Sequence, residues 1–111
     1  MTPPQEFEQT LSNAGIVLEP KEIEQLGLYL ACLLAANESM NLTAIKSADE
    51  AWTRHIADAL TLLAAMSQLE PGAHVIDVGS GGGVPGIPLA ITCPDAKFTL
   101  LEATSKKVAF L

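Results

Sequence analysis

The chain has few aromatic residues and no long apolar run, which excludes several classes of protein. Aromatic residues make up 5% of the 111 residues, whereas hydrophobic residues together make up 49%. This balance predicts a folded domain with an aliphatic core and excludes a disordered chain. The longest apolar run, Leu26 to Ala36, has 11 residues and is too short to span a bilayer. The polar, acidic start of the chain predicts no secretory signal.

Cysteine is also scarce. Cys32 and Cys93 are the two cysteines, and neither lies in a Cys-x-x-Cys motif or at a metal-ligand spacing from a histidine. We therefore expect buried, reduced thiols, with no disulfide and no metal site. Together with the absent signal, this predicts a cytoplasmic protein.

Basic residues are outnumbered. Lys and Arg total 6 against 13 Asp and Glu, for a net charge of −7. All of the excess acid lies in residues 1–70, whereas residues 71–111 are balanced. An acidic chain is poorly suited to bind nucleic acid through the phosphates alone. Any role on RNA would need local basic groups or residues outside this sequence.

The most informative segment is a glycine-rich turn after an apolar run. Residues 75–78 predict a buried parallel strand, and residues 86–91 predict a helix that Pro85 helps to begin. Between them lie three glycines at alternate positions, Gly79, Gly81 and Gly83. Glycines allow a ligand to approach the backbone closely. Strand, turn and helix together predict a cofactor site at the carboxyl end of a parallel sheet.

The sequence of this turn matches the binding patterns of two cofactor classes. Asp77 with the three glycines follows the Asp-x-Gly-x-Gly-x-Gly pattern of enzymes that use S-adenosylmethionine (SAM). Residues 81–86 also match the dinucleotide pattern Gly-x-Gly-x-x-Gly. In that match the glycines begin too far after the strand, and Asp77 would repel a pyrophosphate. SAM is positively charged and has no phosphate, so the sequence favours SAM, and an NAD-dependent oxidoreductase is the alternative.

A second acid completes the predicted site. Glu102 ends a second predicted strand, residues 98–102, where a carboxylate can accept both ribose hydroxyls of either cofactor. The predicted cofactor-binding residues are Asp77, Gly79, Ser80, Gly81, Gly83 and Glu102.

The remaining pattern is helical and precedes the sheet. We expect helices over residues 3–14, from Pro20 to just before Asn37, and from a capping box at Ser47 and Glu50 onward. The predicted apolar stripe of the third helix is Trp52, Ile56, Leu60 and Leu63. The fold class is α/β: a helical segment in residues 1–70 leads into the first part of a Rossmann-like sheet in residues 71–111.

Four motifs in this order resemble one family. They are residues 41–45 (Asn-Leu-Thr-Ala-Ile), residues 54–58 (Arg-His-Ile-Ala-Asp), residues 84–89 (Val-Pro-Gly-Ile-Pro-Leu), and the stretch from Leu101 to Leu111. Together they are similar to the bacterial 16S rRNA guanine-N7 methyltransferases, also called glucose-inhibited division protein B. The resemblance implies a class I SAM-dependent methyltransferase that acts on 16S rRNA or the small ribosomal subunit.

Members of that family are longer and carry a full sheet. The resemblance therefore implies that this sequence corresponds to the N-terminal half, with two strands of the sheet. A two-stranded sheet has open edges, which predict self-association. A non-catalytic fragment, or a SAM-binding module that self-associates, is thus the alternative to an active enzyme.

The family motifs also suggest residues that face the substrate. These are Asn41, Thr43, Arg54, His55, Asp58, Lys106 and Lys107. Each has a simpler interpretation: Asn41 and Thr43 as turn residues, Arg54 with Asp58 as a surface ion pair, His55 bonded to Asp58, and the lysines as solvated charges. No catalytic base is predicted, because guanine N7 carries no proton to remove.

Overall fold

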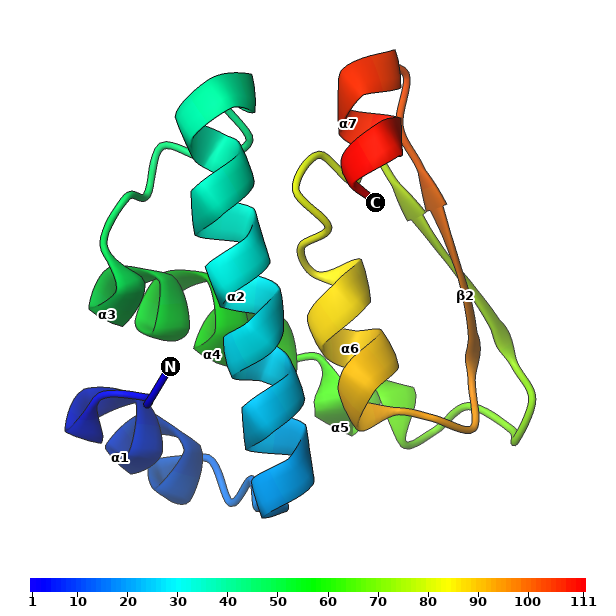
Figure 1. Cartoon of the computed structure of the whole chain (residues 1–111). Helices are drawn as coiled ribbons and strands as arrows, with labels where there is room; N and C mark the ends of the chain where they lie inside the picture. Colours follow the sequence, from blue (N-terminus) through cyan, green and yellow to red (C-terminus); the bar gives the residue numbers. More distant parts are fainter.

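The chain forms a helical region that packs beside a small two-stranded sheet (Figure 1). The computed structural model describes all residues from 1 to 111. The helical region contains α1 (Gln5–Asn13), α2 (Pro20–Met40), α3 (Ala48–Ala51), the π-helix η1 (Trp52–Ile56), α4 (Ala57–Leu60) and α5 (Leu63–Met66). The sheet region contains β1 (His74–Val78), α6 (Gly86–Thr92), β2 (Lys97–Leu101) and α7 (Ser105–Phe110). This order confirms the predicted fold class.

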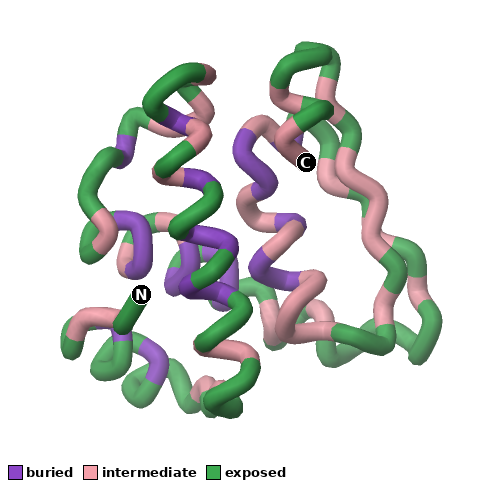
Figure 2. Tube along the Cα trace, in the orientation of Figure 1, coloured by how far each residue is buried: buried purple, intermediate pink, exposed green.

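The hydrophobic core lies where α2 faces η1 and α4. Leu26, Leu30 and Leu33 of α2 are buried at helical spacing, and Trp52 and Ile56 are buried opposite them. Phe7 of α1 closes the core, with its ring centroid 4.9 Å from that of Trp52. Figure 2 shows buried trace in this region and also in parts of α6 and of the segment before it, whereas both strands are coloured as intermediate or exposed. The core therefore belongs mainly to the helical region.

Helix α6 connects the core to the sheet. It lies between α2 and the strands (Figure 1) and contacts α2, α4 and β2. The strands pair in parallel, with Asp77 opposite Leu100 and Val78 opposite Leu101. Because side chains alternate along a strand, Asp77 and Leu100 face α6. Ile76, Val78 and Leu101 lie on the outer face, which no element covers, and all three are exposed.

Helix α2 begins as predicted but ends later. Pro20 is its first residue, and the Glu22 side chain accepts the Glu19 N–H at 2.9 Å. The predicted end before Asn37 is wrong, because the helix continues to Met40 and ends at Asn41, whose φ is 52°. Asn37 is buried inside the helix, and its side chain accepts the backbone N–H of Thr43 at 2.8 Å.

The predicted third helix is divided into short pieces. Ser47 caps its start by accepting the Glu50 N–H, but the Glu50 side chain bonds Arg54 and does not return to the cap. The segment Trp52–Ile56 then widens into a π-helix before α4 and α5. Periodicity alone does not reveal such a change, because a single π turn leaves Trp52, Ile56 and Leu60 on the buried side.

Two predictions about burial are also wrong. Cys32 is exposed and Cys93 is only partly buried; Cys32 lies on the side of α2 opposite the buried leucines. Strand β1 is parallel, but its burial alternates and it is not buried on both faces. A strand is covered on both faces only when helices lie on both sides of its sheet, and α6 covers one side here.

None of the helices combines the length and apolar character needed to cross a membrane.

The position of the core gives a direct test. Leu30 is 0% exposed and Leu28, two residues away on α2, is 67% exposed. We expect Leu30→Ala to lower the free energy of unfolding by about 2–5 kcal/mol, because it removes buried methyl groups and leaves a cavity. Leu28→Ala should change it by less than about 0.5 kcal/mol. Urea unfolding followed by Trp52 fluorescence measures both; equal effects would mean that the core lies elsewhere.

Candidate functional site

The glycine turn, residues 79–83, follows directly after β1 and is held by backbone bonds. The N–H groups of Gly79 and Ser80 both donate to the Leu101 carbonyl at the end of β2, at 2.8 and 3.0 Å. The Ser80 hydroxyl is buried and donates to the Asp77 carbonyl at 2.8 Å. These bonds join the ends of the two strands and shape the turn between them. Ser80 thus has a role within the turn, and its contact with a cofactor stays a prediction.

The glycines of the turn differ in what surrounds them. Gly79 and Gly81 have φ values of 74° and 54°, and a side chain at either would meet no atom within 4 Å. At Gly83 and Gly86 a side chain would collide with Ile87 and Leu100 respectively. Gly79 and Gly81 therefore face open space, where a ligand can approach the backbone, whereas a side chain at Gly83 or Gly86 would require its neighbours to shift.

Asp77 is held at the start of α6. Its Oδ2 atom accepts the Gly86 N–H at 3.1 Å, and a side chain at Gly86 would lie 2.7 Å from that oxygen. The other carboxylate oxygen makes no hydrogen bond within the chain, so it is free to meet a positively charged group. The carboxylate also takes the N–H that a pyrophosphate would need at a helix N-terminus.

Glu102 lies on the other side of the turn. Its Oε1 accepts the Gly81 N–H at 2.8 Å and its Oε2 accepts the Thr104 N–H at 2.9 Å. These two backbone bonds, that with Thr104 first, lower the pKa of Glu102, so it is ionised at neutral pH. Each carboxylate oxygen has a second lone pair. Glu102 can therefore still accept two hydroxyls, as a ribose would offer.

Sequence reasoning missed Tyr29, the only tyrosine in the chain. It is buried on α2, and its hydroxyl donates to the Gly82 carbonyl at 2.7 Å. Burial, with a smaller contribution from the negative Asp77, raises the pKa of Tyr29 far above its ordinary value. The phenol therefore stays protonated and keeps its donor. Because the contact joins residues 53 positions apart, local sequence patterns give no signal for it.

His55 and Thr43 meet at a small cavity beside the turn. Thr43 Oγ1 lies 2.7 Å from His55 Nε2 and also accepts the Ile45 N–H at 3.1 Å. Burial, aided by the nearby charge of Arg54, lowers the pKa of His55, so the imidazole is neutral at pH 7. The cavity has a volume of about 200 Å³. Its lining is Leu33, Leu42, Thr43, His55, Ser80, Gly81, Gly82 and Val84.

The other substrate-facing candidates do not join this cluster. Arg54 is exposed and pairs with Glu50 at 2.8 Å, so the suggested pair with Asp58 is not formed. A Glu four residues before a basic residue is the favoured helical arrangement. Asp58 is exposed and makes no bond with His55, which bonds Thr43 instead. Asn41 and Lys106 are also exposed, while Lys107 is partly buried and near enough to Glu102 to lower its pKa slightly.

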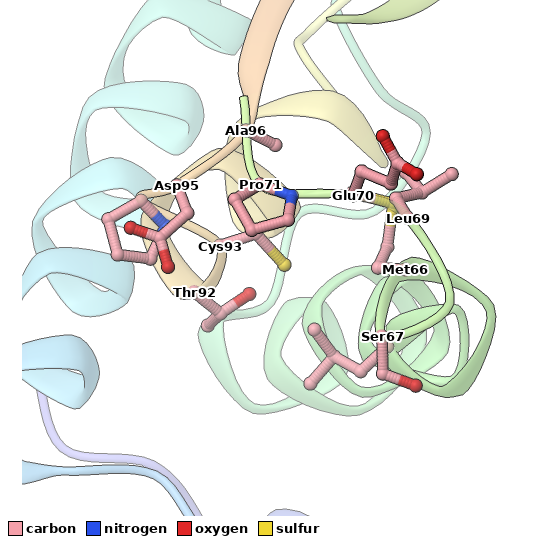
Figure 3. A pocket seen from close by; sticks show the side chains of 11 residues that line it. Met66, Ser67, Leu69, Glu70, Pro71, Thr92, Cys93, Asp95 and Ala96 are labelled. Carbon is pink, nitrogen blue, oxygen red and sulfur yellow. The ribbon is translucent and has the colours of Figure 1, made fainter. Parts of the chain in front are cut away.

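A larger cavity, of about 360 Å³, lies at the opposite end of the sheet (Figure 3). Its walls come from the end of α5, the connection before β1 and the turn before β2, including Glu70, Cys93 and Asp95. Burial raises the pKa of the Cys93 thiol, so this cysteine is not a reactive thiolate. None of the predicted cofactor residues lines this cavity.

The Tyr29 contact can be tested by removing one oxygen. Tyr29→Phe keeps the ring in the core but leaves the Gly82 carbonyl without its donor. We expect the free energy of unfolding to fall by about 1 kcal/mol, with an unchanged far-ultraviolet circular dichroism spectrum. Hydrogen exchange should become faster at the Gly83 amide, which shares a peptide group with the released carbonyl and donates to Ser80 within the turn. An unchanged stability and exchange rate would show that Tyr29 does not hold the turn.

Comparison with known proteins supports the resemblance seen in the motifs. The family model described as GidB, rRNA small subunit methyltransferase G, matches residues 22–111. A protein of Sorangium cellulosum named ribosomal RNA small subunit methyltransferase G is 52% identical over all 111 residues, which cover 46% of that relative. A protein of the same name from Moorella thermoacetica is 44% identical over 89% of the chain, which covers 41% of that relative. Another from Ectopseudomonas mendocina is also 44% identical, over 96% of the chain and 49% of the relative.

The chain spans about half the length of the curated relatives it matches. The match of the family model includes the glycine turn, both acids, Tyr29, Thr43 and His55. It confirms the family predicted from the motifs: the chain belongs to the GidB family, described as rRNA small subunit methyltransferase G.

Proposed function

We propose that this chain forms part of a SAM-dependent methyltransferase that methylates guanine N7 in small-subunit (16S) rRNA. The observation that carries the proposal is the open backbone at Gly79 and Gly81, with Asp77 on one side and Glu102 on the other. The names of the relatives support the substrate class. Such a substrate implies that the protein works in the cytoplasm.

The residues of the site suit SAM in shape and charge. The free oxygen of Asp77 is available to the positive methionine end, and the free lone pairs of Glu102 are available to the ribose hydroxyls. Gly79 and Gly81 leave room for the ligand between these acids. When bound, SAM supplies a methyl group attached to a positively charged sulfur. The chain holds and orients the reactants.

The geometry favours SAM over NAD. A dinucleotide needs its pyrophosphate at the N-terminus of the helix after the turn. In this chain the Asp77 carboxylate accepts the Gly86 N–H at that point, and its charge would repel a pyrophosphate. An NAD-dependent oxidoreductase therefore fits the site less well.

No residue of the site needs to act as a base. Guanine N7 has a lone pair and no proton, so methylation requires alignment and not proton removal. Holding two reactants in line lowers the barrier of such a step by several kcal/mol. The bonds from Tyr29 to Gly82 and from Gly81 to Glu102 give the turn the fixed shape that alignment requires.

SAM binding by the purified chain tests the proposal. In isothermal titration calorimetry we expect saturable binding of SAM and no binding of NADH. Asp77→Asn and Glu102→Gln should each weaken SAM binding by roughly tenfold or more, because each replaces a charged carboxylate acceptor with a neutral amide and so weakens its hydrogen bonds to the ligand. Asp95→Asn and Glu70→Gln, the same changes at the opposite end of the sheet, should leave the affinity unchanged.

The opposite results would be equally clear. A folded chain that gives no heat with SAM has no cofactor site of its own. Equal losses in the site and control variants would mean that charge in general, and not these two carboxylates, governs binding.

As a second function we propose a self-associating module. On the outer face of the sheet, Ile76 and Val78 are 55% and 77% exposed, and Leu101 beside them is also exposed. Strand β1 also has a single partner, β2, so its other edge carries unpaired backbone groups. A second copy of the chain, with the same apolar face, would cover this surface and edge. Association would use the outer face and free edge of the sheet, whereas the proposed SAM site lies at the carboxyl ends of the strands, so the two roles are compatible.

Sedimentation equilibrium tests the association. We expect a concentration-dependent dimer that Ile76→Lys shifts to monomer, because a charge cannot be buried unpaired in an apolar interface. Val17→Lys, at an exposed apolar residue outside the sheet, is the matched control and should still dimerise. A chain that is monomeric at every concentration would exclude the module.

A further inference from the structure

The small cavity beside the glycine turn borders the proposed cofactor residues Ser80 and Gly81 on one side, while Thr43 and His55 on its other side have no part in the cofactor site described above. We propose that it receives the guanine base that is to be methylated. This inference rests on the proposed function, and it assigns the base pocket within the chain. Four features of the cavity support it: its position, its size, its lining and its hydrogen-bonding groups.

The cavity adjoins the cofactor residues. Ser80 and Gly81 of the turn line it, and the Gly81 N–H is bonded to Glu102. The opposite wall comes from Leu42 and Thr43 after α2 and from His55 of η1. A methyl acceptor has to lie next to the donor, because the transfer is an in-line displacement.

Size and lining fit a neutral heterocycle. The volume of about 200 Å³ is below that of sites for drug-sized ligands and suits a single base. Leu33, Leu42 and Val84 supply apolar walls for the faces of a ring. The lining contains no lysine, arginine or acid, so a phosphate or the charged end of the cofactor would find no counter-charge there. A base extruded from its stack meets such a mixture of apolar walls and polar edge groups.

His55 and Thr43 together leave one hydrogen-bond donor for a ligand. A neutral imidazole has one N–H and threonine has one O–H, and the 2.7 Å contact between Nε2 and Oγ1 uses one of these two protons. If Thr43 donates, the His55 Nδ1–H remains; if His55 donates, the Thr43 hydroxyl proton remains. In either tautomer the pair can donate one bond to guanine O6 while N7 stays free to react.

The local backbone fixes the positions of His55 and Thr43. A π turn is rare and is found often at functional sites, and here it spans Trp52–Ile56 and includes His55. Thr43 is fixed from two sides, because its N–H donates to Asn37 and its hydroxyl accepts from Ile45. The donor of the pair is thus positioned before any ligand binds.

The test uses the two histidines of the chain as probes. Guanosine is titrated into the protein saturated with S-adenosylhomocysteine, and the histidine ring signals are followed by ¹H–¹³C NMR. The His55 signal, identified by its loss in His55→Asn, should shift and saturate. His74 lies on the outer face of the sheet, bonded to Thr99, and its signal should not move. Cytidine is the control nucleoside and should shift neither signal.

A matched pair of variants tests the pairing of His55 with Thr43. Thr43→Val removes the hydroxyl at nearly constant volume and should weaken guanosine binding roughly fivefold or more, with the affinity for S-adenosylhomocysteine unchanged. Thr43→Ser keeps the hydroxyl and should bind guanosine as the wild type does.

Each outcome separates this inference from the proposed function. If S-adenosylhomocysteine binds and guanosine leaves His55 unmoved, the base pocket is wrong and the cofactor site stands. If S-adenosylhomocysteine does not bind but guanosine titrated into the chain alone shifts His55, the pocket stands and the methyltransferase proposal fails. Equal loss of both ligands in Thr43→Val would overturn the inference, because the cavity would then belong to the cofactor.

Discussion

The arrangement of the whole site depends on the buried face of α2. Leu30 packs in the core against the η1 and α4 residues, and the neighbouring Tyr29 donates a hydrogen bond to Gly82. One helix thus supports both the core and the glycine turn. Farther along α2, Asn37 bonds the backbone of Thr43 and so sets the wall opposite the turn. A change in the packing of α2 would move both sides of the site together.

The two acids of the site are held by backbone N–H groups rather than by basic side chains. Asp77 takes its bond from the start of α6, and Glu102 takes its bonds from the turn and from Thr104. Their charges are therefore fixed in place but not neutralised by an ion pair. A positively charged ligand without phosphates is the natural complement. The chain as a whole, at −7, is poorly suited to bind the phosphates of RNA.

The two faces of the sheet differ in their exposure to solvent, because α6 covers only one of them. α6 lies over Asp77 and Leu100, while Ile76, Val78 and Leu101 remain exposed on the other side. The same alternation that points Asp77 toward the turn and α6 points its apolar neighbours to solvent. The placement of Asp77 beside the turn and the exposure of Ile76 and Val78 therefore both follow from the alternation of side chains along β1.

The sequence by itself determined the order of elements, the glycine turn with its two acids, the start of α2 at Pro20 and the apolar face of Trp52 and Ile56. These features depend on local periodicity, on proline and glycine geometry and on short spacings. Only the tertiary structure decided that Asn37 continues a helix, that Trp52–Ile56 forms a π turn, and that Arg54 pairs with Glu50. It also decided which distant groups meet, Tyr29 with Gly82 and Thr43 with His55. Such contacts arise from the packing of separate helices on one another, and no pattern within a single segment encodes which side chains that packing brings together.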